Sequence, residues 1–172
     1  MTKPRYQDVP SSAIPEVTDD DGTTVRVVCG EFWGKTGPVD GVAAEPRYLD
    51  VSVPAGKKKR LKVEDYRQAF AYVFEGSGDF ADASEPFGAL REAQVDGEEV
   101  LIRDKVGNRS LVVFGTGDEI SVLAGDEGVR FLLVSGRPLR EPIAWHGPIV
   151  MNTQAEIRKA MMDLRDGSFI RR

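Results

Sequence analysis

The sequence has few of the residues that bind transition metals or form disulfides. Its 172 residues include one histidine, His146, and one cysteine, Cys29. A non-haem iron site needs several imidazoles with a carboxylate, and catalytic zinc needs about three nitrogen, sulfur or oxygen ligands. We therefore expect no two-histidine site and no metal cofactor in this chain. A carboxylate-only magnesium or calcium site stays open, although no loop has the alternating acidic spacing of such sites.

Other features are absent as well. A single cysteine excludes an intrachain disulfide, which fits a reducing cytoplasm, the compartment that we expect. No apolar run approaches the length of a membrane span, and Met1–Pro4 does not lead into a signal-peptide core. The net charge is −5, whereas phosphate binding needs a clustered basic face. We expect neither a membrane nor direct nucleic acid as a partner.

Short apolar segments separated by glycine turns predict an all-β fold in a chain long enough for one core. Tyr48–Val53 alternates apolar and polar residues, the period-two pattern of a half-buried strand. Many short strands at such intervals are typical of an antiparallel barrel or jelly roll. The other predicted strands are Thr24–Trp33, Arg67–Glu75, Glu98–Arg103, Arg109–Phe114, Glu119–Ala124 and Arg130–Val134, with glycine turns at 76–78, 107–108, 115–117 and 125–128.

Only the C-terminal end predicts a helix. Thr153 and Glu156 have the spacing of a capping box, and Gly167 is a stop signal. Between them lies an apolar stripe at helical spacing, which we expect to face the barrel. The stripe consists of Ile157, Ala160, Met161 and Leu164.

Three prolines precede this helix. Pro138, Pro142 and Pro148 lack a backbone donor, so their segment cannot form a helix or a central strand. We expect an extended surface segment with Ile143, Trp145, Ile149, Val150 and Met151 as apolar anchors. The predicted organisation is an extended arm at 1–23, a barrel at 24–135, and a proline-rich segment with a helix at 136–172 docked on the barrel.

The segment GRPLREPIAWHGPIVMNT and the following AEIRKAMMDLRDGSFIRR resemble the C-terminal end of the pirin family, in the cupin superfamily. PRYQDV near the start and YLDVSV and AFAYVFEG in the middle resemble the same half. The resemblance implies a cupin-type double-stranded β-helix, a jelly-roll barrel. Full-length pirins consist of two cupin barrels in one chain, and iron is held in the N-terminal barrel. This chain resembles only the C-terminal barrel.

The two cupin motifs can be laid on this sequence by spacing. Gly56 and Gly76 match the glycines of the first motif, and Gly117 and Gly125 match those of the second. The metal-ligand slots of these motifs hold Lys62, Glu64, Ala69 and Gly128. An ammonium group at such a slot repels a metal cation. We therefore predict that the turns are retained and the metal chemistry is lost.

The remaining candidate residues have a structural and a functional interpretation. His146 could act as a general base, but a structural role in its proline turn is favoured, and Cys29 is predicted to be a small buried residue. Lys62 and Glu64 could orient a ligand in the barrel mouth, or could fill a former metal cavity as an ion pair. Tyr66, Tyr72, Trp145 and His146 are possible ligand or partner contacts.

Two groups of residues have a structural interpretation that we favour. We expect the basic tetrad Lys57–Arg60 to lie in a solvated loop beside a strand, although it could be a targeting or phosphate patch. The aromatic residues of the middle segment are predicted to be strand core rather than a flavonoid pocket. They are Tyr66, Phe70, Tyr72 and Phe74.

Three functions follow from the resemblance. The first is a metal-free, non-catalytic cupin that supports an iron-bearing N-terminal cupin or associates with a protein. We expect the contact with the N-terminal cupin, or with a second copy in a homodimer, to be made by the barrel and the C-terminal proline-rich segment. The second is a part of a quercetin (flavonol) dioxygenase whose metal site lies outside this chain. The third is a redox-linked transcriptional cofactor that acts through a protein partner.

Overall fold

The structure is a computed structural model that describes residues 6–80, 87–88, 91–95, 98–102 and 106–170. The chain divides into two compact units, Met1–Pro138 and Leu139–Arg172. Among the described residues, no helix is both long enough and apolar enough to cross a membrane.

Strands dominate the described residues, which confirms the predicted all-β class. The helical segments are a 3-10 turn at Ser11–Ala13 and α1 at Gln154–Arg165. The strands are β1 (Glu16–Thr18), β2 (Thr24–Cys29), β3 (Glu31–Phe32), β4 (Lys35–Thr36), β5 (Arg47–Val53), β6 (Lys58–Lys62), β7 (Gln68–Asp79), β8 (Phe87–Gly88), β9 (Arg91–Val95), β10 (Glu98–Ile102), β11 (Val106–Gly107), β12 (Ser110–Val113), β13 (Glu119–Gly136), β14 (Ala144–His146) and β15 (Ile149–Met151). Arg103, the predicted end of the strand at β10, lies outside the described residues.

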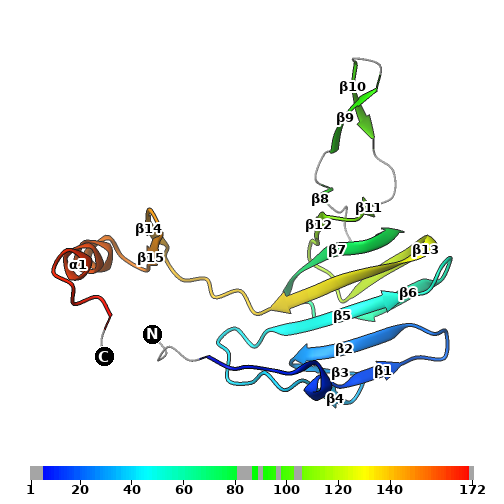
Figure 1. Cartoon of the computed structure of the whole chain (residues 1–172), viewed down its shortest axis with the longest axis horizontal. Coiled ribbons are helices and arrows are strands. Elements are labelled where there is room, and N and C mark those ends of the chain that lie inside the picture. The colour runs from blue at the N-terminus through cyan, green and yellow to red at the C-terminus, as the bar shows by residue number, and fades with distance from the viewer. Residues whose placement is uncertain (1–5, 81–86, 89–90, 96–97, 103–105, 171–172) are drawn as a thin grey trace. The chain divides into compact units, whose positions relative to one another are not determined.

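One antiparallel sheet organises the first unit (Figure 1). Its strands follow the order β1-β2-β5-β13-β7-β12-β8, while β6 also pairs with β13 and β11 with β7. The long strand β13 lies at the centre, because its first part pairs with β6 and its second part pairs with both β5 and β7. Within the predicted arm at 1–23, Glu16–Thr18 joins this sheet as β1.

Alternation along these strands builds the core. Leu49, Val51 and Val53 on β5 lie opposite Leu133, Phe131 and Val129 on β13, and all six are buried. Each large apolar side chain removed from water in this way contributes roughly 1.5–3 kcal/mol. The cluster also takes in Val25, Val27, Phe32, Leu61, Val63, Ala69, Ala71, Val73, Phe80, Val112, Ile120, Val122 and Ala124.

A bulge replaces the turn that was predicted at 125–128. The chain continues through these residues as β13, and its register with β7 shifts between Ala124 and Val129. Gly76 (φ +67°) and Gly128 (φ +82°) face each other there, and a Cβ atom added at Gly76 would collide with the carbonyl oxygen of Gly128. The two glycines therefore allow the strands to approach closely, and β7 likewise continues through its predicted end at 76–78.

The basic tetrad is not a solvated loop. It enters β6, and Lys59 is buried with its ammonium group bonded to Asp19 and, at 2.9 Å, to Asp21. The ammonium group also lies 5.0 Å from the centre of the Trp33 ring. Burial lowers the pKa of Lys59, but the bonds to both carboxylates outweigh burial and raise it. These contacts attach the turn before β2 to β6.

The second unit is a β14–β15 hairpin with α1 packed on it. Thr153 and Glu156 form the predicted capping box, and Ala144, Ile149, Ile157 and Ala160 make a small buried cluster. Of the expected apolar anchors, Ile149 is buried and Met151 is partly buried, while the other three are exposed. Met161 and Leu164 of the predicted stripe are also exposed. Docking of this unit on the barrel stays a prediction.

Replacing Gly76 with alanine tests the bulge. We expect Gly76→Ala to destabilise the fold by about 3 kcal/mol or more, because the added methyl group meets the Gly128 carbonyl and the backbone is left-handed. The matched control is Gly107→Ala, where no atom lies within 4 Å of the added carbon. Urea unfolding measures both, and equal losses would contradict the proposed close approach.

Acid titration tests the Lys59 cluster. Burial raises the pKa of Asp21, but bonds from Lys59 and the Thr23 amide outweigh burial and lower it from 3.8 to about 2. Since this pKa is depressed in the folded state, its stabilising effect is complete above about pH 4 and is lost as the pH falls towards 2. Unfolding free energies between pH 7 and pH 2 should fall less steeply below pH 4 in Asp21→Asn than in the wild type. The exposed control Asp65→Asn should follow the wild type, and parallel curves for all three would refute the pairing.

Candidate functional site

The four degenerate metal-ligand slots do not form one site. Ala69 lies on β7 opposite Ser135, whereas Gly128 lies beside Gly76 at the far end of the same strand pair. The length of β7 between Ala69 and Gly76 corresponds to roughly 20 Å of extended chain. Spacing in the sequence therefore placed Gly128 in the wrong part of the fold for a site shared with Ala69.

The slot residue Glu64 is paired with two arginines. Its carboxylate accepts hydrogen bonds from Arg47 Nη1 at 3.0 Å and Nη2 at 2.7 Å, and Arg67 Nε lies 2.9 Å from it as an ion pair without hydrogen-bond geometry. Lys62 is exposed on β6, opposite Glu119. The predicted Lys62–Glu64 pair is replaced by the contacts of Glu64 with Arg47 and Arg67.

The electrostatics of Glu64 follow from these contacts. Burial raises the pKa of the carboxyl group, but the bonds from Arg47 and the positive charges of Arg47 and Arg67 outweigh burial and lower it. A carboxylate that already neutralises two guanidinium groups is a poor ligand for a cation.

The other two slots offer no donor atom. Ala69 presents a buried methyl group, and Gly128 has φ +82° with its Cβ position 3.0 Å from the Val53 carbonyl oxygen. A histidine at Gly128 would meet that oxygen in a strained backbone. Across the described ranges, no group of three or more histidine, cysteine, aspartate or glutamate residues could hold a metal ion. This set of residues does not fit the iron site of cupins.

Cys29 and Tyr66 are held by neighbours. The Cys29 thiol is buried and donates to the Pro46 carbonyl, which confirms the prediction of a small buried residue, and burial raises its pKa. Tyr66 is half-exposed, with the guanidinium carbons of Arg67 and Arg137 at 5.4 and 5.7 Å from its ring centre. These cation–π contacts already occupy the ring.

Trp145 and His146 lie in the second unit. Both are exposed on β14, where Trp145 pairs with Val150 and His146 pairs with Ile149. The Trp145 indole donates to the Gly147 carbonyl within the same turn. The structure thus leaves both side chains open for contact but gives neither a catalytic neighbour among the described residues.

The prediction that the aromatic residues of β7 belong to the core is wrong. Ala69, Ala71 and Val73 face inward and are buried, which leaves Phe70 and Tyr72 on the outer side, 39% and 38% exposed. Residues that alternate along a strand face opposite sides of the sheet, and here the smaller residues face the core. In the sequence, the alternation Ala-Phe-Ala-Tyr-Val already indicated that the small residues and the aromatic residues lie on opposite sides of the sheet.

Neighbouring strands extend these two aromatic residues into a surface, here named the outer patch. Phe70 lies between Val134 and Val113, and Tyr72 lies between Leu132 and Leu111. Leu111 and Val113 are 44% and 43% exposed. The outer patch consists of Tyr48, Phe70, Tyr72, Leu111, Val113, Leu132 and Val134.

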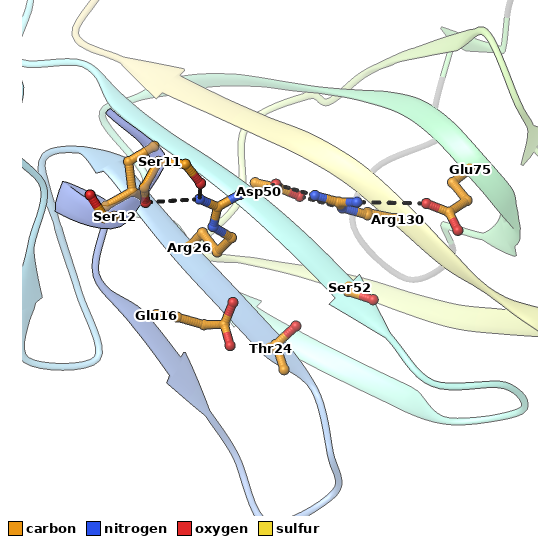
Figure 2. A pocket seen from close by; sticks show the side chains of 10 residues that line it. Ser11, Ser12, Glu16, Thr24, Arg26, Asp50, Ser52, Glu75 and Arg130 are labelled. Carbon is orange, nitrogen blue, oxygen red and sulfur yellow. Dashed lines mark hydrogen bonds and ion pairs between the residues drawn. The ribbon is translucent and has the colours of Figure 1, made fainter. Parts of the chain in front are cut away.

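Four charged residues cross the same side of the sheet beside the outer patch, and we name them the charged row. They are Arg26, Asp50, Arg130 and Glu75, on β2, β5, β13 and β7, and they alternate in charge in that order (Figure 2). Arg130 donates two hydrogen bonds to Asp50, at 2.9 and 2.7 Å. Its guanidinium group lies 3.7 Å from the Glu75 carboxylate, and the guanidinium group of Arg26 lies 3.9 Å from Asp50. The bonds to Asp50 raise the pKa of Arg130 despite its partial burial.

A polar hollow of about 650 Å³ lies over this row. The 3-10 turn forms one wall, because Arg26 donates to the hydroxyl and carbonyl oxygens of Ser11 (Figure 2). The other lining residues of the hollow include Ser12, Ile14 and Glu16. The guanidinium groups of the row each lie beside a carboxylate, and Glu16 adds a further negative charge to the lining of the hollow.

Comparison with known proteins identifies relatives of this chain. The family described as the Pirin C-terminal cupin domain matches residues 48–170. A pirin-like protein of Caulobacter vibrioides is 35% identical over 98% of this chain and 54% of its own length, and human pirin is 30% identical over 96% and 51%. The chain spans about half the length of the curated relatives it matches.

A solved structure shows the same relationship. The crystal structure of a quercetin 2,3-dioxygenase from Acinetobacter baumannii is 27% identical, with a TM-score of 0.74, and the match covers 96% of this chain and 50% of that one. The shared fold agrees with the cupin-type jelly roll that the sequence resemblance implied.

Removal of the Glu64 charge tests its structural role. In Glu64→Gln the largely buried side chains of Arg47 and Arg67 lose their counter-charge, so we expect a loss of about 1–3 kcal/mol in unfolding free energy. The control is Glu119→Gln, whose partner Arg60 is mostly exposed and whose loss should stay below about 0.5 kcal/mol. Urea denaturation at pH 7 compares them, and equal losses would count against the role of Glu64.

Proposed function

The chain belongs to the pirin family, as its C-terminal cupin domain, and from this premise we propose that it is a non-catalytic association module of the cytoplasm. The observation that carries the proposal is the state of the four ligand slots. Lys62 is exposed, Glu64 is paired with arginines, and Ala69 and Gly128 have no donor side chain. Oxygen chemistry at a metal needs ligands that these positions lack.

The outer patch supports association as the function. Antiparallel sheets that face water on one side usually carry polar residues there, whereas this sheet carries seven apolar residues in adjacent strands. Contiguous apolar surface beside charged groups is characteristic of protein–protein interfaces. The occupant would be an iron-bearing N-terminal cupin, another protein or a second copy of the chain.

A second function has a specific observation in its favour. The Acinetobacter baumannii quercetin 2,3-dioxygenase shares the fold of this chain over half of its length. If this chain is one part of such an enzyme, the metal and the flavonol would bind to residues outside it, and this cupin would support the catalytic part.

A redox-linked transcriptional role is compatible with the net charge of −5, which favours protein partners over DNA.

Metal content tests the non-catalytic proposal. We expect the purified chain, produced with iron, nickel and copper in the growth medium, to contain these metals far below one equivalent and to leave quercetin unconsumed. Inductively coupled plasma mass spectrometry and the loss of flavonol absorbance measure the two quantities. The Acinetobacter baumannii quercetin 2,3-dioxygenase, treated in parallel, is the positive control. Stoichiometric metal with quercetin turnover in the chain alone would overturn the proposal.

A further inference from the structure

We propose that Arg47, Arg67 and Ser135 form a binding site for a small monocarboxylate at one end of the core of the first unit. This inference goes beyond the proposed association function and does not rest on it. It follows from two properties of the described residues. One is the place where buried polar atoms lack a partner, and the other is the charge that the surrounding groups leave in excess.

Buried polar atoms without a hydrogen bond gather in one place. In the part of the chain that the structure describes, four buried side-chain nitrogen or oxygen atoms have no hydrogen-bond partner. One is the Thr23 hydroxyl, and the others are Nε of Arg47, Nε of Arg67 and the hydroxyl of Ser135. The Arg67 side chain is 9% exposed, and Ser135 is 2% exposed. Because buried polar groups are nearly always hydrogen-bonded, this group of three indicates a ligand that accepts hydrogen bonds.

Strand register and side-chain contacts bring the three groups together. Ser135 on β13 lies opposite Arg47 on β5, so the two side chains are neighbours on one face of the sheet. Arg47 donates through both Nη atoms to Glu64, and Arg67 Nε lies 2.9 Å from the same carboxylate without hydrogen-bond geometry. Ala69, the neighbour of Ser135 on β7, adds only a methyl group and no competing polar partner.

The charges around these groups favour a monoanion. Two guanidinium groups surround one carboxylate, that of Glu64, which leaves one positive charge in excess. The adjacent Arg137 and Glu45 form their own ion pair at 3.3 Å and do not change this balance. The planar oxygens of a carboxylate match arginine N–H donors and can also accept from a hydroxyl group. A dianion such as phosphate would leave a negative charge uncompensated in a largely buried place.

The cluster is open to water on the side of Glu64. The Glu64 side chain is 34% exposed, whereas those of Arg47 and Arg67 are 14% and 9% exposed. Arg67 Nη1 donates to the Glu45 carbonyl at 2.6 Å, which holds the guanidinium group in place before a ligand arrives. Donors that are fixed in advance lose less entropy on binding. A small anion therefore reaches both arginines from the side of Glu64.

Arginine Nε–H signals in a two-dimensional nitrogen–proton NMR spectrum test the site directly. When acetate replaces chloride at constant ionic strength, the Nε–H signals of Arg47 and Arg67 should shift and saturate. Arg130 is the internal control, because its Nε already donates to Asp50 at 2.9 Å and its signal should stay in place. No saturation up to about 0.1 M acetate, an equal response to phosphate, or a matching shift at Arg130 would overturn the inference.

Two serine variants on β13 separate a ligand contact from a structural one. Ser135→Ala should raise the dissociation constant of acetate about tenfold. Ser121 is a buried serine in the part of β13 that pairs with β6, and Ser121→Ala should leave this constant unchanged. Without acetate, Ser135→Ala should unfold at the wild-type temperature, because its hydroxyl has no partner to lose. A lower unfolding temperature, or equal effects of both variants on acetate binding, would contradict the assignment.

Removal of the competing carboxylate tests the charge argument. In Glu64→Gln both guanidinium groups lose their counter-charge, so acetate should bind about fivefold more tightly or better than in the wild type. The same NMR titration measures this, and thermal unfolding in acetate checks that the variant is folded. Unchanged or weaker binding in the folded variant would overturn the role of the excess charge.

The outcomes separate this inference from the proposed function. Absence of acetate binding would overturn the carboxylate site and leave the association function in place. Metal binding with quercetin turnover would instead contradict the non-catalytic function without reference to the two arginines.

Discussion

The pairing of β7 with β13 determines which side chains this protein buries and which it presents. Their register turns Ala69, Ala71 and Val73 inward and leaves Phe70 and Tyr72 outside. Because β5 and β12 continue the same alternation, apolar residues gather on both sides of one sheet. The inner side forms the core. The outer side forms an apolar surface, whereas the solvent side of an antiparallel sheet is usually polar. Both the fold and the proposed association therefore depend on this strand pair.

Charged groups on the inner side of the sheet are paired within the chain. Arg47 and Arg67 form ion pairs with Glu64 at one end of the core. Lys59 forms hydrogen-bonded ion pairs with Asp19 and Asp21. Partly buried charges are tolerated when such partners satisfy them. Where the cupin resemblance leads one to expect ligands open to a metal, this chain has salt bridges, a methyl group and a glycine. That difference is the physical basis of the proposed association role.

Local patterns predicted much of the fold. The capping box at Thr153, the half-buried strand at Tyr48–Val53 and the all-β class follow from periodicity and short-range hydrogen bonding, which the sequence encodes directly. The sequence could not distinguish the bulge at Gly128 from a turn, because glycine occurs in both. Only the pairing of β13 with β7 determines which of the two forms. Spacing also misplaced the ligand slots, since the position of Gly128 depends on strand register. Burial of Lys59 depended on Asp19 and Asp21, which are distant in sequence.

The central claim is that the cupin ligand slots of this chain hold no metal, because Glu64 is paired with Arg47 and Arg67 and the other slots carry an exposed lysine, a methyl group and a glycine. Isothermal titration calorimetry of the purified chain with ferrous iron, under anaerobic conditions, measures this directly. The account predicts no heat beyond that of dilution. Saturable binding of one equivalent of iron that Glu64→Gln abolishes would contradict it.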